Sequence, residues 1–154
     1  MISLRPAKAE DAGLLASWFN DRDNTRYMED TTDFYCAEEL KNSINRDSAD
    51  FIAMLDGKPV GYCSLYDFDG KGAESSVLIG EKDAQGRGYG SGILRALCET
   101  AFRDIGLEEI RSYIDEDNLP AIGMCLSCGF EVVGKRGRDV ALLKKKETQA
   151  TFRA

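Results

Sequence analysis

Hydrophobic positions divide the chain into helical and extended segments. In residues 9–20 the apolar side chains fall on one side of a helix, after an acidic opening turn: Leu14, Leu15, Trp18 and Phe19. We expect a second helix over residues 37–46. Short apolar segments between turn residues predict strands at 2–6, 51–55, 59–66, 74–80, 110–114, 130–133 and 140–143. Asp56-Gly57, between two of these strands, predicts a tight hairpin.

Two further helices are expected in the second half of the chain. One covers residues 88–103, after a glycine-rich segment. The other covers residues 119–128, with Pro120 in its first turn and Gly129 where it stops. The order β-α-α-β-β-β-α-β-α-β-β predicts an α+β fold, with a central mixed, mostly antiparallel sheet flanked by helices. At 154 residues the chain suits a single domain over 1–154, with a short tail from about residue 145.

The composition is typical of an intracellular protein. Apolar runs are only a few residues long and the N-terminus carries no signal-peptide core, so we expect no membrane segment, no membrane partner and a cytoplasmic location. The five cysteines are odd in number and scattered. This distribution fits reduced thiols better than a disulfide framework.

The charged residues and the absence of histidine narrow the chemistry. There are 27 acidic and 20 basic residues, which give a net charge of −7. This balance argues against a nucleic-acid partner and mildly favours a cationic substrate, although acidity also serves solubility. The chain has no histidine, which excludes Ser-His-Asp and Cys-His catalysis and any histidine metal site. Acid and base work therefore falls to carboxylates, Cys, Tyr, Lys or water.

A glycine-rich segment lies between a predicted strand and a predicted helix, with the sequence Gln85-Gly86-Arg87-Gly88-Tyr89-Gly90-Ser91-Gly92. Glycines let the backbone turn tightly and approach a ligand, and the free N–H groups at the start of the following helix favour an anion. The segment therefore predicts a phosphate-binding loop. A glycine-rich turn without a ligand is the alternative.

Two common nucleotide-binding loops do not match this segment. A dinucleotide pattern G-x-G-x-x-G that starts at Gly86 meets Ser91, and one that starts at Gly88 meets Ile93. A Walker A loop needs Gly-Lys followed by Ser or Thr. The Gly-Lys pairs of this chain are followed by Pro59, Gly72 and Arg136.

The spacing that remains, Gln85-x-x-Gly88-x-Gly90, resembles the acyl-CoA pyrophosphate loop (Q/R-x-x-G-x-G/A) of the GNAT superfamily of N-acyltransferases. A second segment, from Asn118 to Phe130, is similar without a gap to the family pattern N-x-x-A-I-x-L-Y-E-K-L-G-F. The predicted order of elements agrees with the family. The resemblance spans nearly the whole chain and implies a GNAT-like fold.

The N-terminal half is similar to one branch of this superfamily, which acetylates ribosomal-protein N-termini, polyamines and amino sugars. The similar segments are Leu4-Arg5-Pro6 and Trp18-Phe19-Asn20-Asp21. They are less specific than the two later motifs. They leave the identity of the acceptor open.

The resemblance implies acetyl-CoA as the acyl donor, with no metal, and assigns the residues that bind it. Gln85 belongs to the expected cofactor site, and the pyrophosphate would meet the N–H groups of Arg87, Gly88, Tyr89, Gly90 and Ser91. The pantetheine arm would pair, like an added strand, with the backbone of Leu78, Ile79 and Gly80. Carried over by position, the Leu78 N–H is the expected oxyanion donor. Asn118 would fasten the cofactor near its thiol end.

An amine acceptor must lose a proton before it attacks a thioester, because an alkylammonium with a pKa near ~10 is mostly protonated at neutral pH. Glu74 lies eleven residues before Gln85, a spacing at which several GNAT enzymes carry a glutamate base, and we expect it to be the base. In another branch the base corresponds to Tyr113. If Glu74 is not the base, a water chain or one of three other carboxylates would take this role: Asp67, Asp69 or Glu81. The alternative is that Glu74 is a solvated residue at the start of a strand, with no catalytic role.

The family tyrosine that protonates the leaving thiolate is replaced here by Cys125. A thiol with a pKa near ~8.5 can donate a proton, so Cys125 is either a general acid or a small buried apolar residue. The pair Cys125-x-x-Cys128 lacks the further ligands of a zinc site, and it lies at the wrong end of its helix for a redox pair. A group of aromatic residues either walls the acceptor pocket or belongs to the core: Tyr62, Tyr66, Phe68, Trp18 and Phe19.

These features predict an N-acetyltransferase that moves an acetyl group from acetyl-CoA to a primary amine by direct attack in a ternary complex. We expect a small-molecule or peptide amine as the acceptor, and the sequence leaves a homodimer open. One alternative is an acyl-CoA-binding regulatory module with impaired catalysis, because the family tyrosine is missing. The other is a protein N-terminal acetyltransferase.

Overall fold

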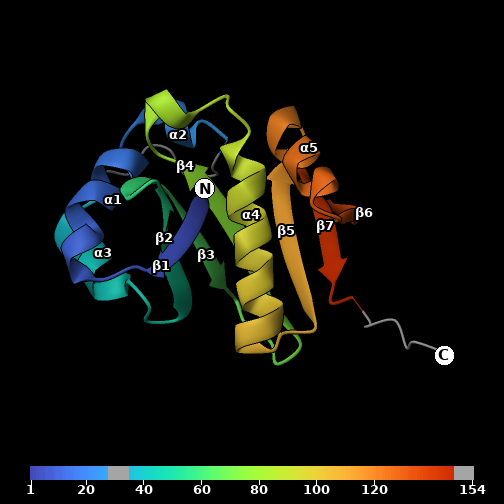
Figure 1. Cartoon of the computed structure of the whole chain (residues 1–154). Helices are drawn as coiled ribbons and strands as arrows, with labels where there is room; N and C mark the ends of the chain where they lie inside the picture. The colour runs from blue at the N-terminus through green and yellow to red at the C-terminus, as the bar shows by residue number, and fades with distance from the viewer. Residues whose placement is uncertain (28–34, 148–154) are drawn as a thin grey trace.

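The computed structural model describes residues 1–27 and 35–147 and contains one seven-stranded sheet with helices on both faces (Figure 1). The strands are β1 (Ile2–Pro6), β2 (Ser48–Leu55), β3 (Lys58–Tyr66), β4 (Gly72–Ile79), β5 (Glu109–Asp115), β6 (Glu131–Arg136) and β7 (Asp139–Lys145). The α-helices are α1 (Ala12–Phe19), α2 (Arg22–Thr25), α3 (Ala37–Ser43), α4 (Tyr89–Glu99) and α5 (Leu119–Ser127). Short helical turns flank them at η1 (Ala9–Asp11), η2 (Lys82–Ala84) and η3 (Thr100–Ile105).

The strands are ordered β1-β2-β3-β4-β5-β7-β6, and all neighbours are antiparallel except β4 and β5. This parallel pair holds together over only three positions, Gly72 to Glu74 against Glu109 to Arg111. Both strands continue further, β4 to Ile79 and β5 to Asp115. The two strands therefore separate beyond Glu74 and leave a gap in the middle of the sheet.

The side of the sheet that faces α4 is apolar. Because side chains alternate along a strand, odd-numbered residues of β2, β3 and β4 point to this side. They form one buried cluster with α4, which includes Ala53, Cys63, Leu65, Ala73, Ile93, Leu94 and Leu97. The apolar stripe of α4 thus fastens this helix across the middle strands, where Figure 1 shows it in front of the sheet.

The opposite side of the same three strands is largely polar. Even-numbered residues point there, and they include Ser48, Asp50, Tyr62, Ser64, Tyr66, Glu74 and Ser76. Trp18 and Leu15 of α1 pack against Ile52 and cover its β1 and β2 end. Where the described helices leave a polar sheet face uncovered, a ligand can bind.

The predicted fold class is confirmed, and the elements appear in the predicted order. The Asp56-Gly57 hairpin is also confirmed: both residues have positive φ angles, of 49° and 82°, as a tight hairpin turn requires. The helix expected at 88–103 differs, because α-helical bonding ends at Glu99 and a π-helical turn follows to Ile105. The short helix α2 is an addition to the predicted elements. Of the expected tail, residues 148–154 lie outside the described residues.

None of the helices in the described parts of the chain combines the length and apolar character that crossing a membrane requires.

Candidate active site

The glycine loop leads from the end of β4 into the first turn of α4. Gly86 and Gly88 have φ angles of 72° and 80°, in the left-handed region that side chains other than glycine rarely adopt. Gly88 is the N-cap residue of α4 and has this conformation. As in any α-helix, the first N–H groups of α4 have no partner within the helix. A Cβ at either glycine would meet no atom within 4 Å, so backbone conformation, not space, demands glycine here.

Two other glycines of the site serve packing inside the protein. A Cβ on Gly90 would lie 2.8 Å from the Met124 sulfur of α5. A Cβ on Gly80 would fall within the ring of Trp18. Gly90 therefore lets α4 and α5 approach each other, and the contact of its N–H with a pyrophosphate stays a prediction.

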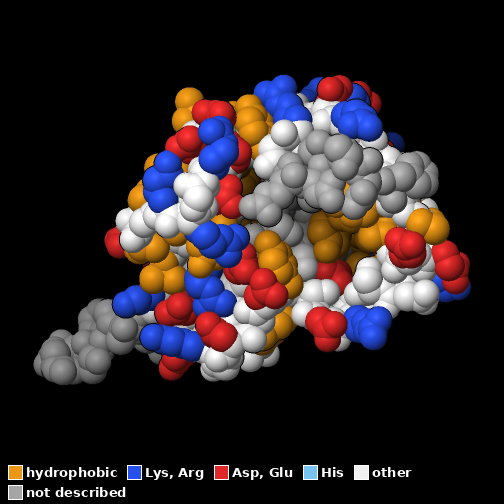
Figure 2. All heavy atoms as spheres, turned by 180° about the vertical axis from the view of Figure 1, so that it is seen from behind, with side chains coloured by type: hydrophobic (Ala, Val, Ile, Leu, Met, Phe, Trp, Pro, Cys, Tyr) orange, Lys and Arg blue, Asp and Glu red, His pale blue; other side chains and the backbone are white. Residues whose placement is uncertain are grey.

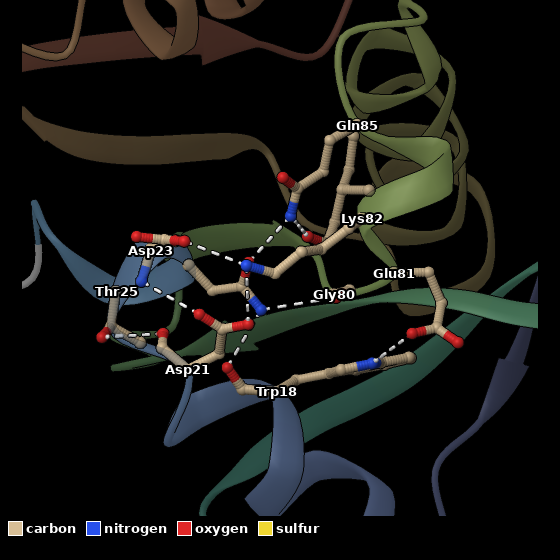
Figure 3. A network of polar contacts seen from close by, with 10 residues as sticks. Trp18, Asp21, Asp23, Thr25, Gly80, Glu81, Lys82 and Gln85 are labelled. Atoms are coloured by element: carbon tan, nitrogen blue, oxygen red, sulfur yellow. Dashed lines mark hydrogen bonds and ion pairs between the residues drawn. The ribbon is translucent and has the colours of Figure 1, made fainter.

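A polar network below the loop holds it against α2 (Figure 3). The Gln85 side-chain N–H groups donate to the Ile79 carbonyl at 2.8 Å and to the Asn24 side chain at 2.7 Å. The Lys82 ammonium lies 2.9 Å from Asp23. The Gln85 side-chain N–H groups therefore position the loop, and the cofactor contact expected of Gln85 stays a prediction.

Along β4, the backbone N–H and C=O groups of successive residues point alternately to β3 and to the gap. The Gly80 N–H donates to the Val60 carbonyl at 2.9 Å, on the β3 side. The Lys71 carbonyl accepts from the Glu108 N–H at 2.9 Å, on the β5 side. Since the direction alternates along a strand, even-numbered residues of β4 direct their N–H and C=O groups to β3, and odd-numbered residues direct theirs to the gap.

This alternation corrects the role expected of Leu78. It lies opposite Tyr62 of β3, so its N–H points into the sheet and cannot meet an oxyanion in the gap. The N–H groups that face the gap belong to Val77 and Ile79. The pantetheine contact expected of Gly80 is corrected in the same way, because its N–H is bonded to β3.

A cavity of about 870 Å³ extends over the polar face of the sheet and reaches the gap. Its wall brings together Glu74 and Leu78 of β4 with Asn118 and Cys125 at α5, about 40 residues further along the chain. Figure 2, seen from the side opposite α4, shows a hollow with hydrophobic side chains in its depth and acidic side chains near its edge.

The cavity is strongly acidic. Among the described residues its wall holds six carboxylates, Asp47, Asp50, Asp67, Glu74, Asp115 and Asp139. Against them stand two basic side chains, Arg46 and Arg136. An excess of fixed negative charge in a concave site attracts cations.

Asp50 is a buried carboxylate, and its hydrogen-bond partners among the described residues are all neutral. One of its oxygens accepts from the hydroxyls of Tyr62 at 2.7 Å and Ser64 at 2.6 Å. The other accepts from the Asn45 N–H and the Ser48 hydroxyl, each at 2.7 Å. Burial would raise the pKa of Asp50, but these hydrogen bonds outweigh burial and lower the pKa. Asp50 therefore keeps a full negative charge in the cavity wall.

Glu74 lies at the point where β4 and β5 separate, and the residue is 8% exposed. Burial and the neighbouring Asp67 carboxyl raise the pKa of Glu74, although the Arg136 guanidinium, 3.6 Å away, opposes this. A raised pKa brings a carboxyl group closer to neutral pH. This is the direction in which a general base is tuned for proton transfer.

The family described as "Acetyltransferase (GNAT) domain" matches residues 2–131. The chain belongs to the GNAT acetyltransferase family. It is 26% identical over 144 residues to an uncharacterized N-acetyltransferase p20 of Bacillus licheniformis, a match that covers 86% of this chain and 80% of that one. It is 32% identical to an aminoglycoside N(6')-acetyltransferase type 1 of Klebsiella pneumoniae over 96 residues, about half of each chain.

Solved GNAT structures share the fold. An aminoglycoside acetyltransferase in complex with coenzyme A superimposes with a TM-score of 0.82 and 23% identity over 95% of each chain. A spermidine N-acetyltransferase from Vibrio cholerae, in complex with coenzyme A and spermine, superimposes with a TM-score of 0.82 and 20% identity. That match covers 94% of this chain and 95% of the other.

The other base candidates of this GNAT chain divide into two groups. Asp67 and Tyr113 line the cavity beside Glu74. Asp69 does not, and its carboxylate forms an ion pair with Arg111 at 3.0 Å. Glu81 also lies outside the cavity wall and accepts a hydrogen bond from the Trp18 ring at 3.2 Å. Asp69 and Glu81 thus lie outside the cavity that Glu74 lines, whereas Asp67 and Tyr113 share it.

Cys125 lines the cavity but is 1% exposed, and burial raises the pKa of its thiol to about 11. This environment makes it a weaker acid than an ordinary thiol. Asn118 also lines the cavity and caps α5, where its side chain accepts the Ala121 N–H at 3.4 Å. Cys125 and Cys128 are both free thiols.

The aromatic residues also divide. Tyr62, Tyr66 and Phe19 line the cavity, as one of our two alternatives held. Trp18 instead packs in the core below Gly80, and Phe68 is 44% exposed outside the cavity. Phe68 follows the last residue of β3, so strand alternation no longer directs it to the polar face.

Sequence reasoning missed Asp50 and Arg136. Asp50 was detectable, because Ser48-Ala49-Asp50-Phe51 alternates polar and apolar residues and extends the predicted strand towards its start. Arg136 carried no such signal. It comes from β6, at the edge of the sheet, and β7 and β5 lie between this strand and the gap. Its contact with the cavity therefore depends on the order of the strands.

Proposed function

We propose that this GNAT protein transfers an acetyl group from acetyl-CoA to a primary amine of a cationic small molecule, by direct attack within a ternary complex. One observation carries the proposal: the gap between β4 and β5 opens into an acidic cavity. The relatives that act on aminoglycosides and spermidine support the same class of acceptor.

The features of the gap fit an acyl-CoA. The N–H groups of residues 87–91 lie at the start of α4, where the helix dipole and free donors favour a pyrophosphate, and the Arg87 side chain adds positive charge. The open edge of β4 offers the Ile79 and Val77 N–H groups to a pantetheine arm. Bound acetyl-CoA would supply an acyl group activated as a thioester.

Positioning of the amine follows from the acidic wall. Carboxylates such as Asp50 attract the ammonium form of the acceptor, and Glu74 then accepts a proton from the ammonium group that will attack. The Val77 N–H, which faces the gap from a residue of the cavity wall, is our replacement for Leu78 as donor to the developing oxyanion. Such a donor is worth about 3 kcal/mol in the transition state.

The fate of the leaving thiolate decides the role of Cys125. Because burial raises the pKa of this thiol to about 11, it holds its proton more tightly than the thiolate it would serve. We propose that the thiolate leaves without help from Cys125. The general-acid role inferred from the family position stays a prediction that mutation can test.

Three finer expectations complete the proposal. The free state of all five cysteines supports a reducing, cytoplasmic environment. A cavity in one face of the sheet supports a small-molecule acceptor over a peptide. The homodimer stays a prediction.

Free thiol release in the presence of acetyl-CoA tests the function, with a panel of polyamines, amino sugars and peptide N-termini. We expect release that depends on the amine and is fastest for acceptors with several positive charges. Saturable binding of coenzyme A with no amine-dependent release on the whole panel would favour the regulatory module. Release with peptides alone would favour the protein N-terminal acetyltransferase.

A further inference from the structure

Arg136 reaches the catalytic end of the cavity from the edge strand β6. It pairs with Asp139 of β7, which pairs with Asp115 of β5, so all three side chains share the polar face of the sheet. Its guanidinium carbon lies 3.5 Å from the centre of the Tyr113 ring, and one of its nitrogens lies 3.6 Å from a Glu74 oxygen. A cation of the protein itself therefore occupies the space between these two residues.

The two groups that hold this guanidinium, the Tyr113 ring and the Glu74 carboxylate, can bind any organic cation. An aromatic face attracts a cation through its quadrupole, and a carboxylate attracts it by charge. Three further carboxylates line the same cavity near these groups: Asp67, Asp115 and Asp139. Nothing in this arrangement is specific for a guanidinium rather than an ammonium.

Arg136 is held loosely in comparison with Arg111 on the same face. Arg111 is 18% exposed, forms an ion pair with Asp69 at 3.0 Å and donates to the Asp67 carbonyl at 3.2 Å. Arg136 is 57% exposed, and in the described part of the chain its guanidinium has the stacking contact and the 3.6 Å ion pair but no hydrogen bond. A side chain held in this way can move into solvent when another cation takes its place.

We propose that Arg136 is a specificity-determining residue: its guanidinium fills a cation subsite between the Tyr113 ring and the Glu74 carboxylate, and an ammonium group of the acceptor must displace it. This inference rests on the proposed function. It adds a requirement that the family assignment does not contain.

The requirement favours acceptors with more than one positive charge. A tethered side chain competes at an effective concentration on the order of millimolar, so a single ammonium displaces Arg136 only at high concentration. Asp50 offers a second anchor on the same face. Two strand spacings and two residues separate it from Glu74, which puts the two residues about 12 Å apart. A diamine that spans this distance gains the attraction of the Asp50 charge for its second ammonium group.

Isothermal titration of the free protein with methylguanidinium and with butylamine tests the subsite without any acetyl transfer. The variant is Arg136→Gln. The matched control is Lys135→Gln, which removes the same charge from the neighbouring residue of β6, an exposed side chain paired with Glu116. We expect Arg136→Gln to bind both probes at least tenfold more tightly than the wild type and Lys135→Gln.

Two further variants complete the experiment. Arg136→Met keeps an aliphatic stem on the Tyr113 ring and should show the same gain, which covers the case in which the glutamine variant folds poorly. Arg136→Gln combined with Glu74→Gln should lose the gain, because the vacated subsite then lacks its carboxylate. Binding in both Arg136 variants that is equal to or weaker than in the wild type would overturn the proposal.

The outcome is distinguishable from a failure of the proposed function. If no amine on the panel releases thiol, the function is wrong, whatever the titrations show. If the wild type is active but the Arg136 variants bind the probes no more tightly, only the subsite is wrong. In an active enzyme, Arg136→Gln should also lower KM for monoamines more than for diamines.

Discussion

Glu74 of β4 lies opposite Arg111 of β5 at the last position where these parallel strands pair. One residue earlier the sheet is continuous, and beyond this pair its middle is open. A carboxyl group at this point is partly removed from water by the closed part of the sheet, yet it borders the gap where a thioester would lie. Burial raises the pKa of Glu74, and its position beside the gap is the one that we propose for the base.

Replacement of the proposed base should slow the reaction and change its pH dependence. Glu74→Gln should lower kcat/KM by about 10²-fold or more, most strongly below the pKa of the amine. In the wild type, activity should rise with pH as Glu74 loses its proton, and this limb should be absent in the variant. Profiles of kcat/KM against pH measure both effects, and a profile unchanged by the mutation would exclude Glu74 as the base.

The same substitution should affect stability in the opposite direction to activity. The pKa of Glu74 is raised in the folded state, so folding favours its protonated form. Its contribution is therefore complete below the ordinary glutamate pKa and is lost as pH rises through the raised value. Glu74→Gln should have a higher Tm than the wild type near neutral pH and no advantage in acid. Thermal melts at both pH values check the sign.

Asp50 should matter for both stability and acceptor binding. Asp50→Asn puts an amide N–H₂ where an oxygen accepts two hydrogen bonds, which should lower the free energy of unfolding by about 1–3 kcal/mol. The pKa of Asp50 is lowered in the folded state, so the wild type should lose this advantage as pH falls through that value.

Acceptor binding gives the second readout for Asp50. KM should rise more for diamines than for monoamines in Asp50→Asn, since only diamines reach the second anchor. Asp104→Asn, an exposed residue of the π-helical turn, is the control and should change neither quantity. Equal KM changes for both kinds of amine would remove Asp50 as an anchor.

The glycine loop can be tested by backbone strain alone. Gly88→Ala forces a side chain into the left-handed region and should cost about 1–2 kcal/mol of stability and weaken coenzyme A binding. Gly137→Ala imposes similar strain in the β6–β7 turn, where φ is 59°, and should leave coenzyme A binding unchanged. Titration calorimetry with coenzyme A separates the two. Equal affinity in Gly88→Ala would remove the loop as the pyrophosphate site.

Cys125 should be dispensable for proton transfer. Since the pKa of its buried thiol is raised to about 11, Cys125→Ala should change kcat only a few-fold between pH 7 and 9, with a loss of stability from the small space it leaves. Steady-state kinetics and thermal melts measure these effects. A drop in kcat beyond tenfold at unchanged KM and Tm would restore its role as general acid.

Much of the site was predictable because its signals are local. The positive φ angles at positions 86 and 88 favour glycine whatever surrounds them, and the alternation of polar and apolar residues indicates which strand residues share a face. The contacts that Gln85 and Gly90 make inside the protein were not predicted, for the opposite reason. Their partners, Asn24 and Met124, come from elements that no pattern near the loop reveals.

The sequence by itself determined the order of elements, the glycine loop and the family, since these depend on residues close together in the chain. Only the tertiary structure decided which neighbour each backbone N–H of β4 faces, and this moved the oxyanion role away from Leu78. It also brought Arg136 against Glu74 and Tyr113. Those contacts depend on strand order and on where two strands separate, which are properties of the whole sheet rather than of any segment.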